Sequence, residues 1–216
     1  MAIVKPSRQT TMWSTPSTAP AETQRLAATL AARRTALAHA LDGLAAEVGL
    51  LGEVAHCLLA TLRAGRKLLV AGNGGSAAEA QHFAAELVGR FQRERRPYAA
   101  IALTADTATL TAVANDYGYA EVFARQVRAL GQPGDLLLAF STSGESENVV
   151  RAALAARSLG MHVVAITGAR ESRLGAVADL VVRVAANDPA VTQELHLVLT
   201  HALCDCVEAA LAAELA

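Results

Sequence analysis

Two loops rich in glycine and serine constrain the fold of this chain more than any other feature. Gly72-Asn73-Gly74-Gly75-Ser76 follows the apolar run 67–71, and Ser141-Thr142-Ser143-Gly144-Glu145-Ser146 follows the apolar run 135–140; a segment with helical character comes after each loop. A strand–loop–helix unit presents unpaired N–H groups and the positive end of a helix dipole, which suits an anion. Glycine admits a ligand close to the backbone, and hydroxyl groups add neutral donors. The pair of units predicts a site for a phosphorylated sugar.

The rest of the chain alternates between apolar runs and helical segments. We expect strands at 68–71, 99–103, 136–140, 162–167 and 180–184, and helices at 50–64, 76–91, 106–114, 119–130, 147–159, 174–178 and from 189 or 190 to the C-terminus. Continuous apolar strands separated by helices indicate a parallel sheet covered on both faces. The expected fold class is α/β, a flavodoxin-like or Rossmann-like three-layer sandwich. Ligands of such sheets bind beyond the carboxyl ends of the strands, where both loops fall.

The N-terminal part differs in composition. Residues 1–21 are rich in Ser, Thr and Pro and carry no sustained hydrophobic period, so we expect a flexible tail there. From Glu22, leucines recur at helical spacings, which predicts N-terminal helices within a single domain spanning 22–216. No apolar run approaches the ~18 residues that span a bilayer, and no hydrophobic segment follows Lys5 and Arg8 to form a secretory signal. The expected location is the cytoplasm.

Charge and cysteine content exclude several classes of partner. The net charge of −1 at pH 7 provides no general attraction to nucleic acid or to an anionic membrane. The basic run of Arg93, Arg95 and Arg96 is interpreted as a solvated loop beside a binding pocket. Three cysteines do not form a disulfide framework. We interpret them as small core or interface residues in a reducing compartment; Cys204 and Cys206 face different sides of one helix.

Two predicted helices carry the side chains suited to proton transfer or metal binding. Spacings of three and four residues place the candidates of the first helix on one face, and the last helix carries a second set: Glu79, His82 and Glu86, then Gln193, Glu194, His196 and His201. Facing one another across a pocket, these helices would supply a general acid, a general base or ligands for a divalent metal such as zinc. Spacing alone does not choose between Glu79 and Glu86, or between His196 and His201.

The first loop also matches a dinucleotide fingerprint, G-x-G-x-x-A, through Gly72, Gly74 and Ala77. That fingerprint needs an acidic residue at the end of the next strand, and the nearest candidate, Asp106, lies several residues beyond it. The serine-rich second loop has no part in dinucleotide binding. We therefore expect no nucleotide cofactor.

Taken together, the motifs resemble the sugar isomerase (SIS) domain family, and within it the phosphoheptose isomerases, also called sedoheptulose 7-phosphate isomerases. The resemblance covers roughly residues 50–211. The matching stretches are Gly72-Asn73-Gly74-Gly75-Ser76-Ala77-Ala78, Ala80-Gln81-His82-Phe83-Ala84-Ala85-Glu86-Leu87 with Arg90, Ala114-Asn115-Asp116-Tyr117-Gly118, Ser141-Thr142-Ser143-Gly144, Thr167-Gly168 and Gln193-Glu194-Leu195-His196.

The resemblance implies conversion of sedoheptulose 7-phosphate to D-glycero-D-manno-heptose 7-phosphate through an enediol. It implies Glu86 and His201 as the acid/base pair, and zinc held by His82, Glu86, Gln193 and His201. The substrate-binding set that it implies, together with the loop glycines, is Asn73, Gly74, Gly75, Ser76, Arg90, Asn115, Asp116, Ser141, Thr142, Ser143, Ser146 and Gln193. The family also implies a homotetramer with sites at subunit interfaces, which would give the N-terminal helices a role in assembly.

Three segments depart from the family pattern: Glu145 stands where Asn is common, Glu171-Ser172-Arg173 replaces paired glycines, and Ala190-Val191-Thr192 lacks the usual Arg before Gln193. A specialised substrate, another heptulose or seven-carbon phosphate, is one consequence. The main alternative is a related group that binds a replication initiator protein as a tetrameric scaffold without isomerase activity. That group lacks the acid/base pair, whereas this chain keeps Glu86 and His201. A sugar-phosphate sensor is a further alternative.

Overall fold

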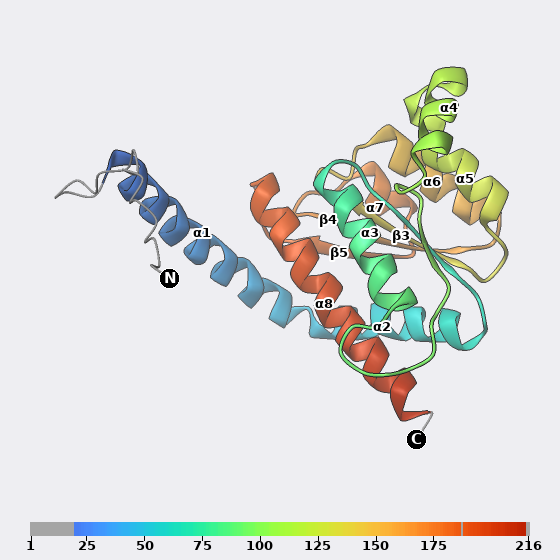
Figure 1. Ribbon diagram of the computed structural model, residues 1–216, viewed down its shortest axis with the longest axis horizontal. Coiled ribbons are helices and arrows are strands. Elements are labelled where there is room, and N and C mark those ends of the chain that lie inside the picture. The colour runs from blue at the N-terminus through green and yellow to red at the C-terminus, as the bar shows by residue number, and fades with distance from the viewer. Residues whose placement is uncertain (1–19, 187, 215–216) are drawn as a thin grey trace, which may run out of the picture. The chain divides into compact units, whose positions relative to one another are not determined.

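The computed structural model (Figure 1) describes residues 20–186 and 188–214. Most of the tail expected at 1–21 therefore lies outside the described residues. The chain divides into two compact units, residues 1–35 and 36–216, each described by itself. The described part of the first unit is the beginning of α1 (Ala21–Ala46), which starts one residue before the helical pattern of the sequence. The second unit holds the remaining elements and every candidate site residue.

Five parallel strands form one sheet in the order β2-β1-β3-β4-β5. The strands are β1 (Leu68–Ala71), β2 (Ala100–Ala102), β3 (Leu136–Ser141), β4 (His162–Gly168) and β5 (Leu180–Val184). In the register of the two central strands, Leu69 pairs with Leu137 and Ala71 with Ala139. The expected parallel α/β sheet is confirmed.

Helices cover both faces because successive strand residues point to opposite sides. Leu68, Val70, Leu136 and Leu138 pack into one core with α2 (Val48–Arg63), α3 (Gly75–Val88) and α8 (Pro189–Ala213). Leu69 and Leu137 belong to the second core, with α5 (Val122–Leu130), α6 (Glu147–Ser158) and α7 (Arg173–Val177). This arrangement is the three-layer sandwich that the alternating apolar runs predict.

Some helix ends lie where the sequence predicts them, and others do not. Asp106 caps α4 (Thr107–Tyr117) by accepting the N–H of Thr109, so α4 starts where expected and runs three residues beyond Ala114. The segment expected as one helix at 119–130 begins with a single 3-10 turn, Tyr119–Glu121. The helix expected at 76–91 ends at Val88, three residues early, for a tertiary reason described below.

Strand order brings the two Gly/Ser loops together. The loop after β1 leads into α3 on one face, the loop after β3 leads into α6 on the other, and β1 and β3 are neighbours. The connections therefore diverge to opposite faces between these two strands. In open α/β sheets such a topological switch point forms a crevice beyond the carboxyl ends of the strands, where ligands bind.

Among the described residues, α8 is long and apolar enough by length and composition to cross a membrane, and the bent pair of α1 and α2 meets the same criterion. Polar residues interrupt α8, so its sequence contains no unbroken apolar run of that length. Half of its most apolar window is buried inside the protein. Leu195, Leu199 and Leu203 lie in the core beside α2 and α3. We therefore assign α8 to the core of the domain.

Candidate active site

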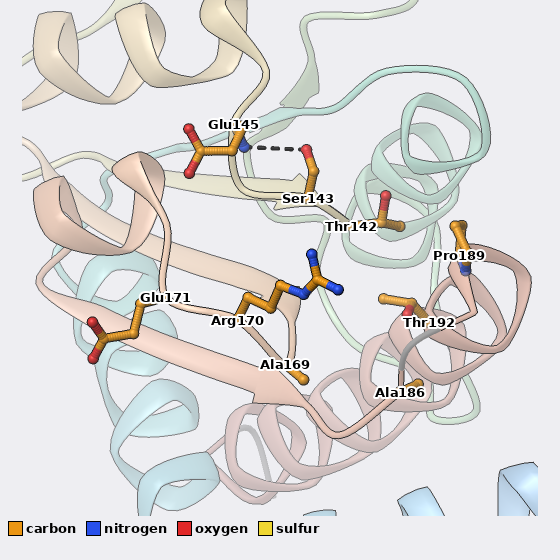
Figure 2. Close-up of a pocket in the computed structure, with 9 residues that line it drawn as sticks. All are labelled: Thr142, Ser143, Glu145, Ala169, Arg170, Glu171, Ala186, Pro189 and Thr192. Atoms are coloured by element: carbon orange, nitrogen blue, oxygen red, sulfur yellow. Dashed lines mark hydrogen bonds between the residues drawn. The ribbon is translucent and has the colours of Figure 1, made fainter.

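The loop after β3 gathers hydroxyl groups at the beginning of α6 (Figure 2). The hydroxyl of Ser141 accepts the N–H of Gly144 at 3.0 Å, and that of Ser143 accepts the N–H of Glu145 at 3.1 Å. Ser146 is the residue before the first turn of α6, and its Oγ lies 3.5 Å from Ser141 Oγ. Three of the predicted hydroxyl residues therefore surround one turn at a helix N-terminus, the setting expected of an anion site.

The loop after β1 is tied to this turn by an amide pair. Asn73 donates to Asn148 Oδ1 at 2.8 Å and accepts from Asn148 Nδ2 at 2.9 Å, while the Tyr119 hydroxyl donates to Asn73 Oδ1 at 3.1 Å. Asn148 lies in the first turn of α6 and is buried. The reciprocal bonds thus hold the two loops together across the switch point.

Close packing explains one glycine of the first loop. A Cβ on Gly75 would lie 2.5 Å from the Cδ atom of Gln193, so any other residue there would displace the Gln193 side chain. Gly74 precedes it with a φ of +58°, a conformation that favours glycine, and Ser76 is buried in the first turn of α3. The loop therefore brings the N-terminus of α3 against the first turns of α8.

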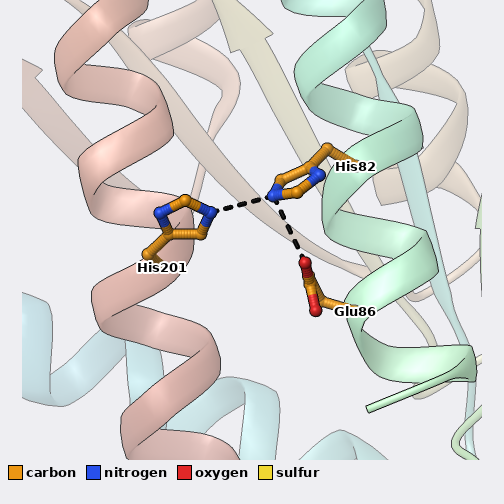
Figure 3. Close-up of side chains that lie close together, drawn as sticks. All are labelled: His82, Glu86 and His201. Atoms are coloured by element: carbon orange, nitrogen blue, oxygen red, sulfur yellow. Dashed lines mark hydrogen bonds and ion pairs between the residues drawn. The ribbon is translucent and has the colours of Figure 1, made fainter. Parts of the chain in front are cut away.

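A cluster of three metal-binding side chains lies between α3 and α8 (Figure 3). His82 Nε2 lies 2.9 Å from His201 Nε2 and 3.3 Å from Glu86 Oε1. One potential ligand atom from each residue falls within 4.8 Å of the others. A cavity of about 550 Å³ between the two helices is lined by His82, His201 and Gln193. These four residues are the set that the resemblance names for zinc.

Glu79 and His196, which residue spacing left as alternatives to Glu86 and His201, form a separate pair. Glu79 Oε2 lies 3.5 Å from His196 Nδ1, and the His196 side chain is 0 % exposed. His196 Nε2 lies 3.4 Å from the carbonyl oxygen of Thr167 at the end of β4. The histidine beside Glu86 is partly exposed and the one beside Glu79 is buried, so the two pairs have different access to a ligand.

A buried ion pair between Arg95 and Glu208 lies near the C-terminal ends of α3 and α8. The Glu208 carboxylate accepts the N–H groups of Phe91, Gln92 and Arg93 at 2.6–2.8 Å, and Arg95 Nε lies 3.3 Å from it. Burial alone would raise the pKa of Glu208, but these N–H groups and Arg95 outweigh it and bring the pKa below its ordinary value. The expectation that the basic run is a solvated loop is therefore wrong for Arg95, which is 7 % exposed.

Arg95 also explains why α3 ends early. Its guanidinium donates to the carbonyl oxygens of Glu86, Leu87 and Gly89, which the helix leaves without intrahelical partners. The chain that follows places the ring of Phe91 against His201, with ring centroids 5.3 Å apart and an interplanar angle of 24°. The Arg95–Glu208 pair thus holds the segment that stacks on the cluster.

The cysteines take different environments. Burial, followed by the negative charge of Glu86, raises the pKa of Cys204 to about 12, so its thiol is uncharged at neutral pH. Cys57 is half-buried and Cys206 is exposed. The expected core position is therefore confirmed for Cys204, and an interface position for Cys206 stays a prediction.

The chain is similar to proteins of a known family. The family model of the SIS domain matches residues 31–168. The phosphoheptose isomerase of Bradyrhizobium sp. strain BTAi1 is 49% identical over 164 residues, which cover 76% of this chain and 83% of that protein. The chain belongs to the phosphoheptose isomerase family of SIS-domain proteins.

Two solved structures of phosphoheptose isomerases are also similar to this chain. The protein from Neisseria gonorrhoeae superposes with a TM-score of 0.79 at 43% identity, covering 87% of this chain and 99% of that one. The protein from Francisella tularensis gives a TM-score of 0.81 at 37% identity, covering 88% and 100%. As a phosphoheptose isomerase family member, the chain is an isomerase with the SIS fold.

Three of the substrate-binding residues that the family pattern names lie neither on the Gly/Ser loops nor on α8. Asn115 and Asp116 are exposed in the last turns of α4, where the Asn115 amide donates to Asp116 at 2.8 Å. Arg90 follows α3 and lies 3.9 Å from Glu94, with its side chain 59% exposed. Because α3 has 14 residues, Arg90 lies about 20 Å from the first loop along the helix axis.

The departures from the phosphoheptose isomerase pattern have local explanations. The Glu145 carboxylate accepts the N–H of Arg173 at 2.9 Å, so it faces the beginning of α7. Ser172 caps α7 by accepting the N–H of Gly175. Thr192 is buried and donates to the Asp188 carbonyl in the first turn of α8. These replacements shape loop and helix ends.

The sequence did not single out Asn148 and Phe91. Asn148 could have been recognised, because a buried polar residue in the first turn behind a Gly/Ser loop needs a hydrogen-bond partner. No sequence pattern pairs Phe91 with His201, since that contact joins segments distant along the chain.

Proposed function

We propose that the protein converts sedoheptulose 7-phosphate to D-glycero-D-manno-heptose 7-phosphate, a ketose-to-aldose isomerisation through an enediol. The cluster of His82, Glu86 and His201 beside a cavity is the observation that carries the proposal. The loops at the switch point support a phosphate-bearing substrate, and the likeness to phosphoheptose isomerases supports a heptose phosphate.

Glu86 is proposed as the carbon base and His201 as the group that serves the oxygens. The carboxylate takes the proton from C1 as the C1–C2 double bond forms and the carbonyl oxygen on C2 gains a proton. Return of a proton to C2, with loss of the O1 proton, yields the aldose. A carboxylate and an imidazole suit these transfers near neutral pH.

The substrate phosphate is remote from the reacting carbons, so its binding energy would serve to position them. Ser76, Ser141, Thr142, Ser143 and Ser146 are proposed to hold it, with Asn73, Asn115, Asp116 and Arg90 contributing to the sugar site. The turn formed by Ser141 and Ser143 at the start of α6 supports that assignment.

The donor set fits a zinc ion. Zinc binds His nitrogen and carboxylate oxygen at about 2.0–2.2 Å, which places neighbouring ligand atoms ~3.3 Å apart. The separations from His82 Nε2 to Glu86 Oε1 and to His201 Nε2, 3.3 and 2.9 Å, agree with that spacing. His82, Glu86 and His201 would hold the ion, and the family implies Gln193, whose amide lies against Gly75 in this structure, as the fourth ligand. When bound, zinc would polarise the substrate carbonyl and favour the enediolate.

The site is proposed to be completed between subunits of a cytoplasmic homotetramer. Glu86 lies three turns beyond Gly75 on α3, about 16 Å along the helix axis. A seven-carbon sugar phosphate is shorter than that, so a phosphate held beside Gly75 would not bring C1 to Glu86 of the same chain. A second subunit supplies Glu86 in this proposal. No nucleic acid, membrane or nucleotide cofactor has a part in it.

Incubation of the purified protein with sedoheptulose 7-phosphate in D₂O, followed by NMR, tests the reaction. We expect a new aldose phosphate carrying deuterium at C2, with loss of turnover on chelation and recovery on adding zinc. Absence of both turnover and exchange in folded, zinc-loaded protein would reject the proposed substrate. Turnover that survives complete removal of metal would reject the zinc requirement alone. The scaffold alternative predicts no exchange, and the relatives do not favour it.

A further inference from the structure

An aromatic ring from outside α3 and α8 covers one face of an imidazole in the metal-binding cluster. The ring of Phe91 is stacked on that of His201, with centroids 5.3 Å apart and an interplanar angle of 24°. Phe91 lies three residues beyond Val88, the last residue of α3. Its side chain is partly buried and packs against the core that includes the apolar face of α8. Phe91 therefore contacts His201 without itself offering a metal ligand or a proton.

Buried hydrogen bonds fix the backbone of Phe91. Its N–H donates to Glu208 Oε1 at 2.8 Å, and the next two N–H groups along the chain donate to the same carboxylate. The Glu208 side chain is 1% exposed and pairs with Arg95. A buried polar network whose members are satisfied is rigid. The Phe91 ring is therefore presented to His201 in a fixed position.

Hydrogen bonds alone do not define the orientation of the His201 ring. Its Nε2 atom lies 2.9 Å from His82 Nε2 (Figure 3). Of residues 20–186 and 188–214, none makes a hydrogen bond with its Nδ1 atom. A histidine that binds a metal is usually held by a hydrogen bond from its other ring nitrogen to a carboxylate or a carbonyl group. Without such a bond, the imidazole rotates within a broad energy well about its Cβ–Cγ bond.

Two ring contacts together define the direction of His201. The Phe91 ring is nearly parallel to the imidazole, whereas the His82 ring meets it edge-on, with centroids 5.1 Å apart and an interplanar angle of 70°. Flat contact with Phe91 limits rotation out of the stacking plane, so Nε2 stays directed at His82. An aliphatic side chain of similar size has no flat face and would allow several ring angles.

We propose that Phe91 is a positioning residue, which holds the His201 ring so that Nε2 points into the metal-binding cluster. The stacked ring performs the task that a hydrogen bond performs for other metal-binding histidines. The effect on zinc affinity rests on the proposed function, whereas the orientation of the ring rests on the contacts above.

Zinc affinity, measured by competition with a chelator, tests the role of Phe91 without turnover. We expect Phe91→Leu to weaken zinc binding about tenfold, because the loss of a group that orients a ligand lowers metal affinity by that order. Phe91→Tyr should restore the wild-type affinity, since it keeps the flat ring. Phe91 is partly exposed, so the added hydroxyl group can reach water.

Phe140→Leu is the matched control. Phe140 is buried, and its ring lies 5.7 Å from that of His196 at an interplanar angle of 47°. This variant therefore removes a phenyl ring from a histidine outside the cluster. It should lower the thermal stability and leave the zinc affinity unchanged. An equal loss of zinc affinity in Phe140→Leu would overturn the proposal, because general destabilisation would then account for the effect.

Crystal structures of the metal-free wild type and of metal-free Phe91→Leu test the ring orientation directly. We expect the His201 ring of the variant to turn away from His82 or to occupy several conformers. An unchanged His201 ring, or a zinc affinity of Phe91→Leu equal to that of a zinc-binding wild type, would overturn the role of Phe91. A wild type that binds no zinc would reject the proposed metal instead, and the two crystal structures would still decide the role of Phe91.

Discussion

At the scale of single residues, burial separates two pairs with the same chemistry. Glu79 on α3 pairs with His196 on α8, whereas Glu86 pairs with His82 on its own helix. The imidazole of the first pair is fully buried beside β4, and the second pair lies with His201 in the partly exposed cluster. A group that exchanges protons with a substrate must reach it, so the proposed catalytic role falls to Glu86 and a packing role to Glu79.

Glu86→Gln should lower kcat at least ~100-fold, because the amide cannot accept the C1 proton while its shape is nearly unchanged. The measurement is the initial rate of aldose formation, with a thermal melt to verify folding. Glu53→Gln, at an exposed position of α2, should retain the wild-type rate. A Glu86→Gln enzyme that works at the rate of its control would remove Glu86 from the mechanism.

At the scale of secondary-structure elements, the Arg95–Glu208 pair couples the ends of α3 and α8. Arg95 satisfies carbonyl groups at the end of α3, and Glu208 binds three N–H groups of the following segment from α8. Both side chains of the pair are 1% exposed. Since Glu86 and His201 lie on these two helices, the pair contributes to the spacing within the cluster.

Glu208→Gln should lower the free energy of unfolding by about 3–5 kcal/mol at pH 7, because it leaves the Arg95 charge buried without a counter-charge. The control Glu214→Gln breaks the exposed pair with Arg63 and should change stability by less than about 1 kcal/mol. Chemical denaturation measures both. Similar losses for the two variants would contradict a special role for the buried pair.

The same substitution predicts a pH dependence with a defined sign. The folded pKa of Glu208 is lowered, so its contribution is complete above its ordinary value of 4.5 and is lost as the pH falls through the folded pKa. The stability difference between wild type and Glu208→Gln should therefore shrink as the pH falls below about 4.5. A difference that stays constant down to pH 3 would show that the carboxylate charge is not what stabilises this end.

At the scale of the whole molecule, the sheet order separates the phosphate loops from the acid/base cluster. The loops lie at the carboxyl ends of β1 and β3, whereas α3 runs back along the sheet and carries Glu86 and Arg90 away from them. A subunit that binds phosphate by its own loops therefore needs Glu86 from a neighbour in the proposed assembly.

Mixed assemblies test this arrangement. A Glu86→Gln chain and a Ser141→Ala/Ser143→Ala chain should each be nearly inactive alone, and co-expression should restore part of the wild-type rate. Recovery is expected because one site in a mixed assembly combines an intact loop with an intact Glu86. Mixing Glu86→Gln with a chain that carries all three substitutions is the control and should give no recovery. Absence of recovery in the first mixture would place Glu86 and the loops of one site on the same chain.

The strands, the helices, the parallel sheet and the position of both Gly/Ser loops could be predicted from the sequence alone. These follow from local signals: apolar runs of strand length, helical spacing, and Gly/Ser turns at strand ends. The helix face that carries Glu79, His82 and Glu86 was equally predictable, because the spacing of residues along one helix determines which side chains lie on the same side.

Which of these residues contact one another depends on the packing of the folded chain. The choice of His201 over His196 beside His82 depends on how α8 packs against α3, and spacing on either helix carries no information about that rotation. The end of α3 at Val88 depends on Arg95 and Glu208, and Glu208 lies more than a hundred residues away. Contacts between distant segments arise from packing of the folded chain, which no local pattern encodes.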